Sequence, residues 1–161
     1  FKNILTIIIP RHTHRVNEII KEIRDLNLNV TVHSSKKTKL KNTDIYIVDT
    51  FGDTQHFHKI ASTVFLGGSI VKRGGQNPLE AARYGARILH GPNVDNFKDI
   101  YKQLKLLRIS VKITSPKKLA SLIVFKKNKY LGNQIKNIGI KILKKTIKEL
   151  DNIINNEFKK T

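Results

Sequence analysis

The feature that most limits how this chain can fold is a regular alternation between short apolar runs and longer amphipathic segments. The apolar runs are rich in Ile and Val, which is typical of strands buried on both faces of a sheet. Because strands and helices alternate along the chain, the sequence predicts an α/β fold with a doubly wound parallel sheet. The predicted strands span residues 4–9, 29–33, 44–49, 63–67, 87–91 and 109–113.

The segments between these strands repeat apolar residues at the spacing of one helix face. Near the C-terminus, Ser115 is a good N-cap and Pro116 suits the first helical position. A longer helix is predicted from about Tyr130, so that residues 115–157 form a helical tail. The other predicted helices span 16–26, 54–61, 77–85 and 96–107.

Length and composition predict one ordinary soluble domain. The 161 residues are enough to bury a core, so we expect a single domain over residues 1–161. The chain has no Cys, which excludes a disulfide framework. It also has no apolar run long enough to cross a bilayer, so we expect a protein that is at most peripheral to a membrane.

The net charge restricts the partners of the chain. Its 31 Lys and Arg residues outnumber 12 Asp and Glu residues, which gives a formal charge of +19 at pH 7. Such a charge favours a polyanionic partner, whether nucleic acid, a phosphorylated lipid or a nucleotide-bearing substrate. A basic nucleic-acid-binding domain stays an alternative, although the sequence has no aromatic stacking motif and no helix-turn-helix signature.

Four distinctive motifs stand where predicted strands end. They are PRHTHR at 10–15, DTFGD at 49–53, GGS at 67–69 and GP at 91–92. In an open parallel sheet, ligands bind outside the carboxyl ends of the strands. We therefore expect the four motifs to share one edge of the sheet and to form a binding site there.

The glycine pairs predict a place where backbone N–H groups can approach an anion closely. Gly67 and Gly68 leave their strand without side chains, and Ser69 adds a hydroxyl donor. Gly74 and Gly75 repeat this arrangement a few residues later. The loop therefore has the residue types of a phosphate cradle, although a glycine pair also occurs in ordinary turns.

The segment after the second glycine pair has the signature of a helix start. Asn77 is a good N-cap, Pro78 suits the first helical position, and Glu80 stands where a capping box places its acid. Such a helix would point its free N–H groups and the positive end of its dipole at the glycine loop. Glu80 keeps two interpretations, a helix cap or a carboxylate free for a ligand.

Arg11 follows the first predicted strand after Pro10, where a guanidinium can bind an anion. Two His-x-His pairs, His12 with His14 and His56 with His58, suggest a metal site. Both pairs fall in loops or at helix starts, and no Cys or clustered carboxylate completes a tetrahedral set. We therefore expect neither a metal nor a cofactor.

The motifs PRH, DTFGD, VFLGGSIV with GGQNPLEAARYG, and GPNVDNF together resemble those of bacterial 3-deoxy-D-manno-octulosonic acid (Kdo) transferases. The usual family forms are close to PRHPERF, DTMGEL, FVGGSLVPHGGHNPLEPAALG and GPHTFNF. The likeness runs from about residue 5 to the last predicted helix. It implies the Rossmann-like C-terminal half of a GT-B glycosyltransferase, which binds the sugar nucleotide CMP-Kdo.

The resemblance also implies a reaction and its setting. Kdo passes from CMP-Kdo to a lipid A precursor in lipopolysaccharide biosynthesis, with inversion and without a metal, at the cytoplasmic face of the inner membrane. The family's catalytic glutamate belongs to an N-terminal acceptor domain that residues 1–161 do not include. We therefore expect these residues to bind CMP-Kdo weakly and to transfer no Kdo alone, with no specific nucleic acid as partner. A UDP-sugar enzyme of the GT-B type is the alternative.

Donor contacts follow from the resemblance position by position. Asp53 replaces a family Glu, and Gln76 replaces a family His, so Gln76 can donate a hydrogen bond but cannot titrate near neutral pH. The implied contacts are Arg11 and His12 at the donor's phosphate or carboxylate, Phe51, Gly52 and Asp53 beside the cytosine, Gly67, Gly68, Ser69 and Gly75 beside the phosphate and sugar, and Asn77 and Glu80 at the ribose hydroxyls or the phosphate.

Overall fold

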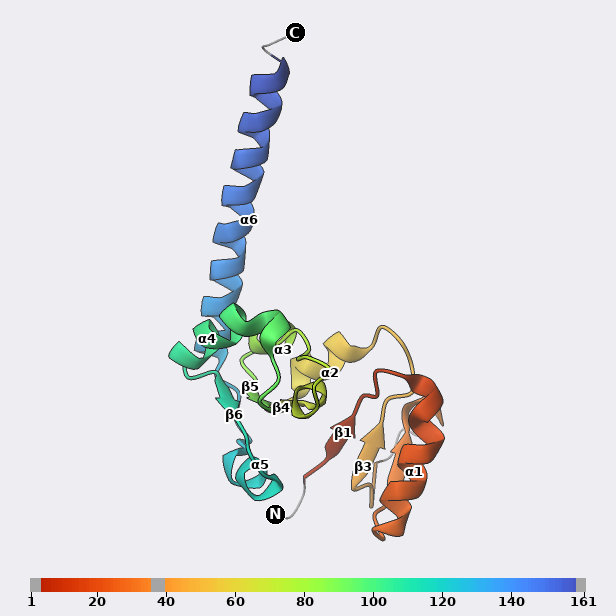
Figure 1. The fold of residues 1–161 in the computed structure, drawn as a ribbon. Coiled ribbons are helices and arrows are strands. Elements are labelled where there is room, and N and C mark those ends of the chain that lie inside the picture. Colours follow the sequence, from red (N-terminus) through yellow and green to blue (C-terminus); the bar gives the residue numbers. More distant parts are fainter. Residues whose placement is uncertain (1–3, 36–39, 159–161) are drawn as a thin grey trace. The chain divides into compact units, whose positions relative to one another are not determined.

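The computed structural model describes residues 4–35 and 40–158, with side chains through residue 155. The chain divides into two compact units, the N-terminal unit Phe1–Phe57 and the C-terminal unit His58–Thr161. Each unit contains one three-stranded parallel sheet, so the strands pair in two sheets where the alternation predicts one. The α/β class, the parallel pairing and the helices at the C-terminal end are confirmed (Figure 1).

The N-terminal unit has the strand order β1-β3-β2. Ile47 of the central strand is aligned with Ile8 on one side and with Val32 on the other. All three strands run parallel, so their carboxyl ends meet at one edge of this sheet. The strands are shorter than predicted and span Thr6–Ile8 (β1), Val30–Val32 (β2) and Ile45–Ile47 (β3).

Helix α1 (Val16–Asp25) covers this sheet with its apolar face, and Ile23 is buried against Ile47. The helix follows the 3₁₀ turn η1 (Thr13–Arg15). Beyond its end lies Asn27 with a positive φ of 58°, a conformation that Asn tolerates better than most residues. The spacing of the apolar residues therefore predicted this helix correctly.

The C-terminal unit has the strand order β4-β5-β6, again entirely parallel. Helix α2 (Thr54–Ile60) contains the boundary between the two units. The strands span Thr63–Leu66 (β4), Arg87–His90 (β5) and Ser110–Lys112 (β6). The remaining helices span Leu79–Ala82 (α3), Lys98–Leu106 (α4), Pro116–Leu122 (α5) and Lys129–Phe158 (α6), and 3₁₀ turns span His33–Ser35 (η2), Gly67–Ile70 (η3) and Asp95–Phe97 (η4).

The core of the C-terminal unit joins its sheet to α3 and α4. The small side chains of Ala81 and Ala82 are completely buried, which lets α3 approach the sheet closely. The first turns of α6 pack against the same core through Leu131 and Ile135. The other buried members of this cluster are Leu66, Ala86, Ile88, Tyr101, Leu104 and Ile109.

Two glycines allow α6 to begin close to the turn after α3. A Cβ atom on Gly132 would lie 2.7 Å from the Gly85 nitrogen, and one on Gly85 would lie 2.4 Å from the Asn128 oxygen. Asn128 N donates to Gly85 O (2.8 Å), and Asn128 Oδ1 accepts from Leu131 N (3.1 Å) at the start of α6. Any larger side chain at either glycine would push these backbones apart.

The helix predicted at 77–85 is much shorter in the structure. α3 has four residues and passes into a turn, in which Gly85 N donates to Ala82 O (2.9 Å) and Gly85 has a φ of +77°. Such a short helix sums few peptide dipoles, so the dipole expected to help an anion is small. The start of α5 is as predicted, because Ser115 Oγ accepts from Lys118 N (3.1 Å).

Candidate functional site

The loop after β1 places Arg11 and His12 at the carboxyl edge of the N-terminal sheet. Both residues are exposed, and the rings of His12 and His14 stack with their centroids 5.5 Å apart. No acidic residue among those described pairs with Arg11, so its guanidinium is open to an anion. Within the described residues, no three His, Cys, Asp or Glu side chains form a metal-binding group.

The loop after β3 lies at the same edge, because β1 and β3 are paired parallel neighbours. Phe51 is 80% exposed, and Gly52 has a φ of +92° with open space around it. Burial alone would raise the pKa of Asp49, but hydrogen bonds from the Ser34 N–H and hydroxyl outweigh it and hold that pKa below its ordinary value. Ser34 and Asp49 thereby fix the base of a loop with an exposed aromatic tip.

The Asp53 carboxylate is turned toward neighbours within its own unit. It accepts from Thr50 Oγ1 (2.5 Å) and lies 3.8 Å from His33 Nε2 and 3.7 Å from His56 Nδ1. His33 Nδ1 is in turn 2.8 Å from the Tyr46 hydroxyl. Asp53 therefore holds its loop in place, and its side chain is 35% exposed.

The two glycine pairs of the C-terminal unit lie close together. A Cβ atom on Gly68 would lie 3.2 Å from the Gly74 oxygen, which is tighter than most side chains allow. Gly74 itself has a φ of +80°, which favours glycine. Gly67 has room beside it, since the nearest atom to a Cβ there would be a Phe65 ring carbon at 3.8 Å.

Two residues that sequence reasoning missed hold the second glycine pair. Asn96 binds the Gly75 backbone on both sides, since its Oδ1 accepts from Gly75 N (2.9 Å) and its Nδ2 donates to Gly75 O (2.8 Å). The Tyr101 hydroxyl donates to Gln76 O (3.2 Å), and burial raises the pKa of Tyr101 to about 12. The GPNVDNF motif contains Asn96, but its spacing alone does not reveal the contact.

Ser69 has a different role from the one predicted for its hydroxyl. Its side chain is completely buried, donates to Leu66 O and accepts from Gly91 N (2.7 Å). The single hydroxyl proton is therefore used inside the protein and is not offered to an anion. Ser69 instead ties the end of β4 to the end of β5.

The structure separates the two interpretations of Glu80. Asn77 Oδ1 accepts from Leu79 N (3.0 Å) at the start of α3, but the N-cap of this helix is Pro78 and not Asn77 as predicted. Glu80 Oε2 lies 3.9 Å from His58 Nδ1, and the Glu80 side chain is 53% exposed. The carboxylate faces His58 and does not complete a capping box, which leaves it accessible to a ligand.

His58 is the buried partner of this carboxylate. Its side chain is only 10% exposed, and its Nδ1 atom has no hydrogen-bond partner within the described structure. Burial lowers the pKa of His58 below its ordinary value, against the opposite effect of Glu80 and with help from Arg83 and Lys127. His58 is therefore neutral at pH 7, and Glu80 is not held in an ion pair.

Each unit thus has its predicted motifs at the carboxyl edge of its own sheet. Arg11, His12 and residues 51–53 follow β1 and β3, whereas the glycine loops, Asn77 and Glu80 follow β4. Participation of all of them in one donor site stays a prediction.

Comparisons with known proteins bear on this arrangement. No family model matches the chain. It is 32% identical to a 3-deoxy-D-manno-octulosonic acid transferase of Rickettsia bellii, over 90% of this chain and 35% of that protein. It is 36% identical to the enzyme of the same name from Rickettsia prowazekii, over 73% of this chain and 25% of that protein.

The chain is a homologue of the Kdo transferases. It spans about a third of the length of the Rickettsia bellii relative. A solved structure, the C-terminal CMP-Kdo binding domain of WaaA from Acinetobacter baumannii, superposes with a TM-score of 0.68 at 24% identity. That match covers 72% of this chain and 61% of the other, and it shows that this Kdo transferase homologue shares the fold of that domain.

Proposed function

We propose that the chain is the donor-binding part of a Kdo transferase, which passes Kdo from CMP-Kdo to a lipid A precursor in lipopolysaccharide biosynthesis. The observation that carries the proposal is the 32% identity to a Kdo transferase over 90% of the chain. A shared fold with a domain named for CMP-Kdo binding supports it further. The transfer reaction is proposed for the whole protein.

Glu80 and the glycine loop are the proposed contacts in the C-terminal unit. A carboxylate that accepts two hydroxyl hydrogen bonds suits a ribose, and Glu80 is exposed and not used in a capping box. Gly67 and Gly68 let backbone N–H groups approach the donor phosphate without side chains in the way. Gly75 and Asn77 shape this loop, and Ser69 acts here through the loop it holds.

The N-terminal unit supplies a second set of proposed contacts. Arg11, open to solvent at its sheet edge, suits the phosphate or the carboxylate of the donor, with His12 beside it. The exposed ring of Phe51 and the open backbone of Gly52 suit the flat cytosine. Asp53 would act by fixing this loop, because its carboxylate faces His33 and His56.

The proposed chemistry is direct displacement with inversion. An acceptor hydroxyl oxygen forms a bond to the anomeric carbon of Kdo while the bond from that carbon to the CMP phosphate oxygen breaks, and CMP leaves with the electron pair. Backbone N–H groups at the glycine loop would stabilise the charge that develops on the departing phosphate. The acceptor proton passes to a base that we do not assign to this chain.

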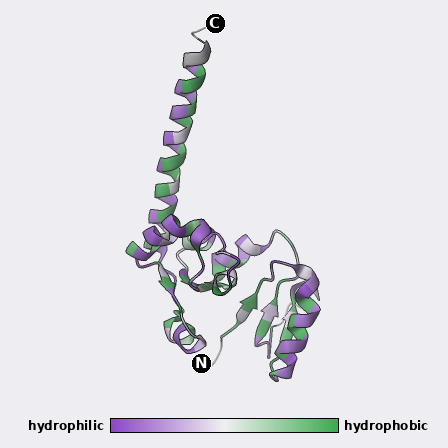
Figure 2. Ribbon diagram, viewed as in Figure 1, coloured by the Kyte–Doolittle hydropathy of each residue, from purple (hydrophilic) through white to green (hydrophobic). Residues whose placement is uncertain are grey.

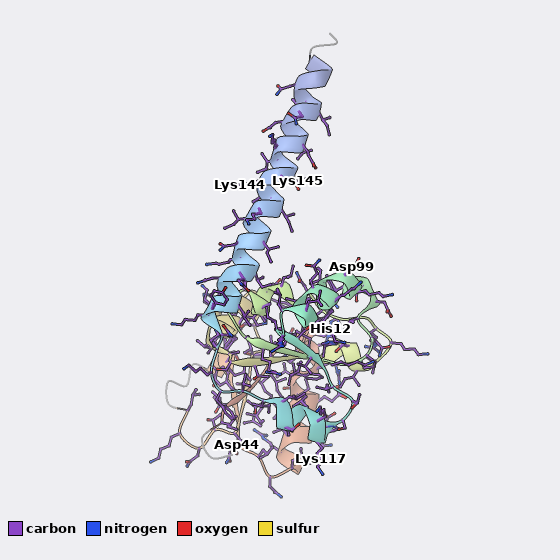
Figure 3. The ribbon with its side chains drawn as sticks, turned by 90° about the vertical axis from the view of Figure 1, so that its left-hand side faces the viewer. His12, Asp44, Asp99, Lys117, Lys144 and Lys145 are labelled. Carbon is purple, nitrogen blue, oxygen red and sulfur yellow. The ribbon has the colours of Figure 1, made fainter. Side chains whose placement is uncertain are left out.

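We propose that the protein lies at the cytoplasmic face of the inner membrane, and the properties of α6 support this location. No described helix is both long and apolar enough to cross a bilayer. Along α6, however, hydrophobic and hydrophilic residues alternate (Figure 2), many of the apolar residues are exposed, and Lys144 and Lys145 project from this helix (Figure 3). Basic amphipathic helices of this kind bind anionic lipid surfaces. The exposed apolar residues are Ile138, Ile140, Ile142, Leu143, Ile147, Leu150, Ile153 and Ile154.

Thermal-shift titration with CMP, UDP and a short oligonucleotide tests the donor proposal. We expect stabilisation by CMP, little by UDP, and about tenfold weaker CMP binding in Glu80→Gln, because a charged acceptor of hydroxyl hydrogen bonds is lost. Glu149→Gln on α6 is the matched control and should bind CMP like the wild type. Preference for UDP would favour another GT-B enzyme, and salt-sensitive oligonucleotide binding without a CMP response would favour a nucleic-acid binder.

A further inference from the structure

A cationic cavity lies at the end of the C-terminal sheet opposite the glycine loops. It measures about 290 Å³ and is found where β5 and β6 begin. Arg87 is the first residue of β5, Arg108 lies just before β6, and Lys126 belongs to the connection between α5 and α6. Three separate segments thus bring one cation each to the same cavity.

The cavity has no counter-charge of its own. No Asp or Glu lines it, and none of its three cations forms an ion pair with a described residue. An anion inside the cavity would be attracted by all three cations. The lining therefore favours occupation by a negative group.

Arg87, which lines the cavity, has a side-chain donor without an acceptor. Its Nε atom is buried and has no hydrogen-bond partner within the described structure. A buried donor without an acceptor has lost its hydrogen bonds to water and has not replaced them, which is unfavourable and therefore rare in folded proteins. Because the guanidinium presents its N–H groups as a planar fork, two oxygens of one oxyanion are the acceptors that fit it.

Arg108 has a backbone conformation that its residue type disfavours. Its φ is +56°, in the left-handed region, at the turn that leaves α4. The other non-glycine residues described with positive φ are Asn27 and Asn42, and Asn is the residue type that tolerates this region. The chain thus uses Asn at two such turns and Arg at the one beside the cavity.

We propose that this cavity is a binding site for a phosphate-type oxyanion, held by Arg87, Arg108 and Lys126. Ile109 and Leu131 form an apolar part of the lining, which suits the organic part of a phosphate ester. The phosphate could belong to a free ion or small ester, or to a lipid headgroup, and all present the same oxygens. The site does not depend on the proposed donor function, because it is at the other end of the sheet.

Amide and guanidinium Nε–H NMR signals of the full chain, titrated with inorganic phosphate, test the proposal. We expect saturable shifts at Arg87 and Arg108, with binding about tenfold weaker in Arg87→Gln and in Arg108→Gly. Lys141→Gln, which removes one charge from α6, is the matched control and should leave phosphate binding unchanged. A short-chain phosphatidic acid below its micellar concentration forms the lipid arm, and tighter binding than inorganic phosphate would identify a headgroup.

Arg108→Gly also tests whether Arg108 binds the anion or is only an unfavourable residue for its turn. Glycine relieves the positive φ, so we expect this variant to melt at a higher temperature while it loses phosphate. Unchanged phosphate binding in both Arg variants, no saturable shift at Arg87, or an equal loss in Lys141→Gln would each overturn the proposal. Glycerol phosphate that binds while phosphatidic acid does not would keep the site and assign it to small esters.

Discussion

His58 Nδ1 lies 3.9 Å from Glu80 Oε2 and joins α2 to the start of α3. The histidine is buried and the carboxylate is half exposed, so the two groups respond differently to pH. Because burial lowers the pKa of His58, the imidazole is neutral at pH 7, and Glu80 keeps its oxygens for a ligand. His58 therefore lies beside the proposed ribose acceptor without forming an ion pair with it.

Acidification should destabilise the fold through His58. A histidine with a lowered pKa in the native state binds fewer protons there than in the unfolded chain, so the free energy of unfolding falls as pH drops below about 6.5. We expect a smaller fall in His58→Gln, and His14→Gln, which removes an exposed histidine, is the matched control. Denaturant unfolding at several pH values measures these slopes. Some slope remains in His58→Gln, because burial also lowers the pKa of His90.

Ser69→Ala should destabilise the C-terminal unit by about 1–3 kcal/mol, because the buried Gly91 N–H loses its acceptor and Leu66 O loses its donor. Ser121→Ala is the control. Its hydroxyl makes an exposed bond to Lys118 O within α5, so its removal should change stability by less than about 0.5 kcal/mol. Equal effects of the two changes on denaturant unfolding would contradict the assigned role of Ser69.

Two glycines of α6 should respond in opposite ways to alanine. Gly132→Ala places a Cβ atom 2.7 Å from the Gly85 backbone and should destabilise the fold by about 1–3 kcal/mol. Gly139→Ala meets nothing within 4 Å and should raise helix content, since Ala favours a helix interior over Gly by up to about 1 kcal/mol. Far-UV circular dichroism and thermal unfolding compare them. A loss of stability in Gly139→Ala would show that α6 packs there.

The sequence predicted the positions of the strands and helices better than it predicted which strands pair with one another. Apolar runs such as ILTIII and RILHG correctly predicted the positions of the six described strands, because buried strands consist mainly of apolar residues. Their division into two sheets depends on contacts between distant segments, which local pattern does not encode. For the same reason neither the approach of Gly68 to Gly74 nor the bonds from Asn96 and Tyr101 were predicted from the sequence.

Side-chain roles were predictable only in part. The Asn77 side chain accepts from Leu79 N at the start of α3, close to its predicted role, because such a bond joins residues that are near in sequence. The Ser69 hydroxyl is bound by Gly91, 22 residues away, and the Glu80 carboxylate faces His58, also 22 residues away. Residue spacing does not predict either contact. The bond between Ser69 and Gly91 and the position of His58 beside Glu80 are therefore known only from the structure.

The central claim is that the glycine loop and Glu80 hold a cytidine nucleotide. Titration of the full chain with CMP, followed by amide NMR signals, tests it most directly, with UMP and inorganic phosphate as comparison ligands. We predict that Gly68, Gly75 and Glu80 shift together and saturate at lower CMP than UMP concentration, and that Glu80→Gln weakens this response. No saturable shift at these three residues, or identical responses to CMP and inorganic phosphate, would contradict the account.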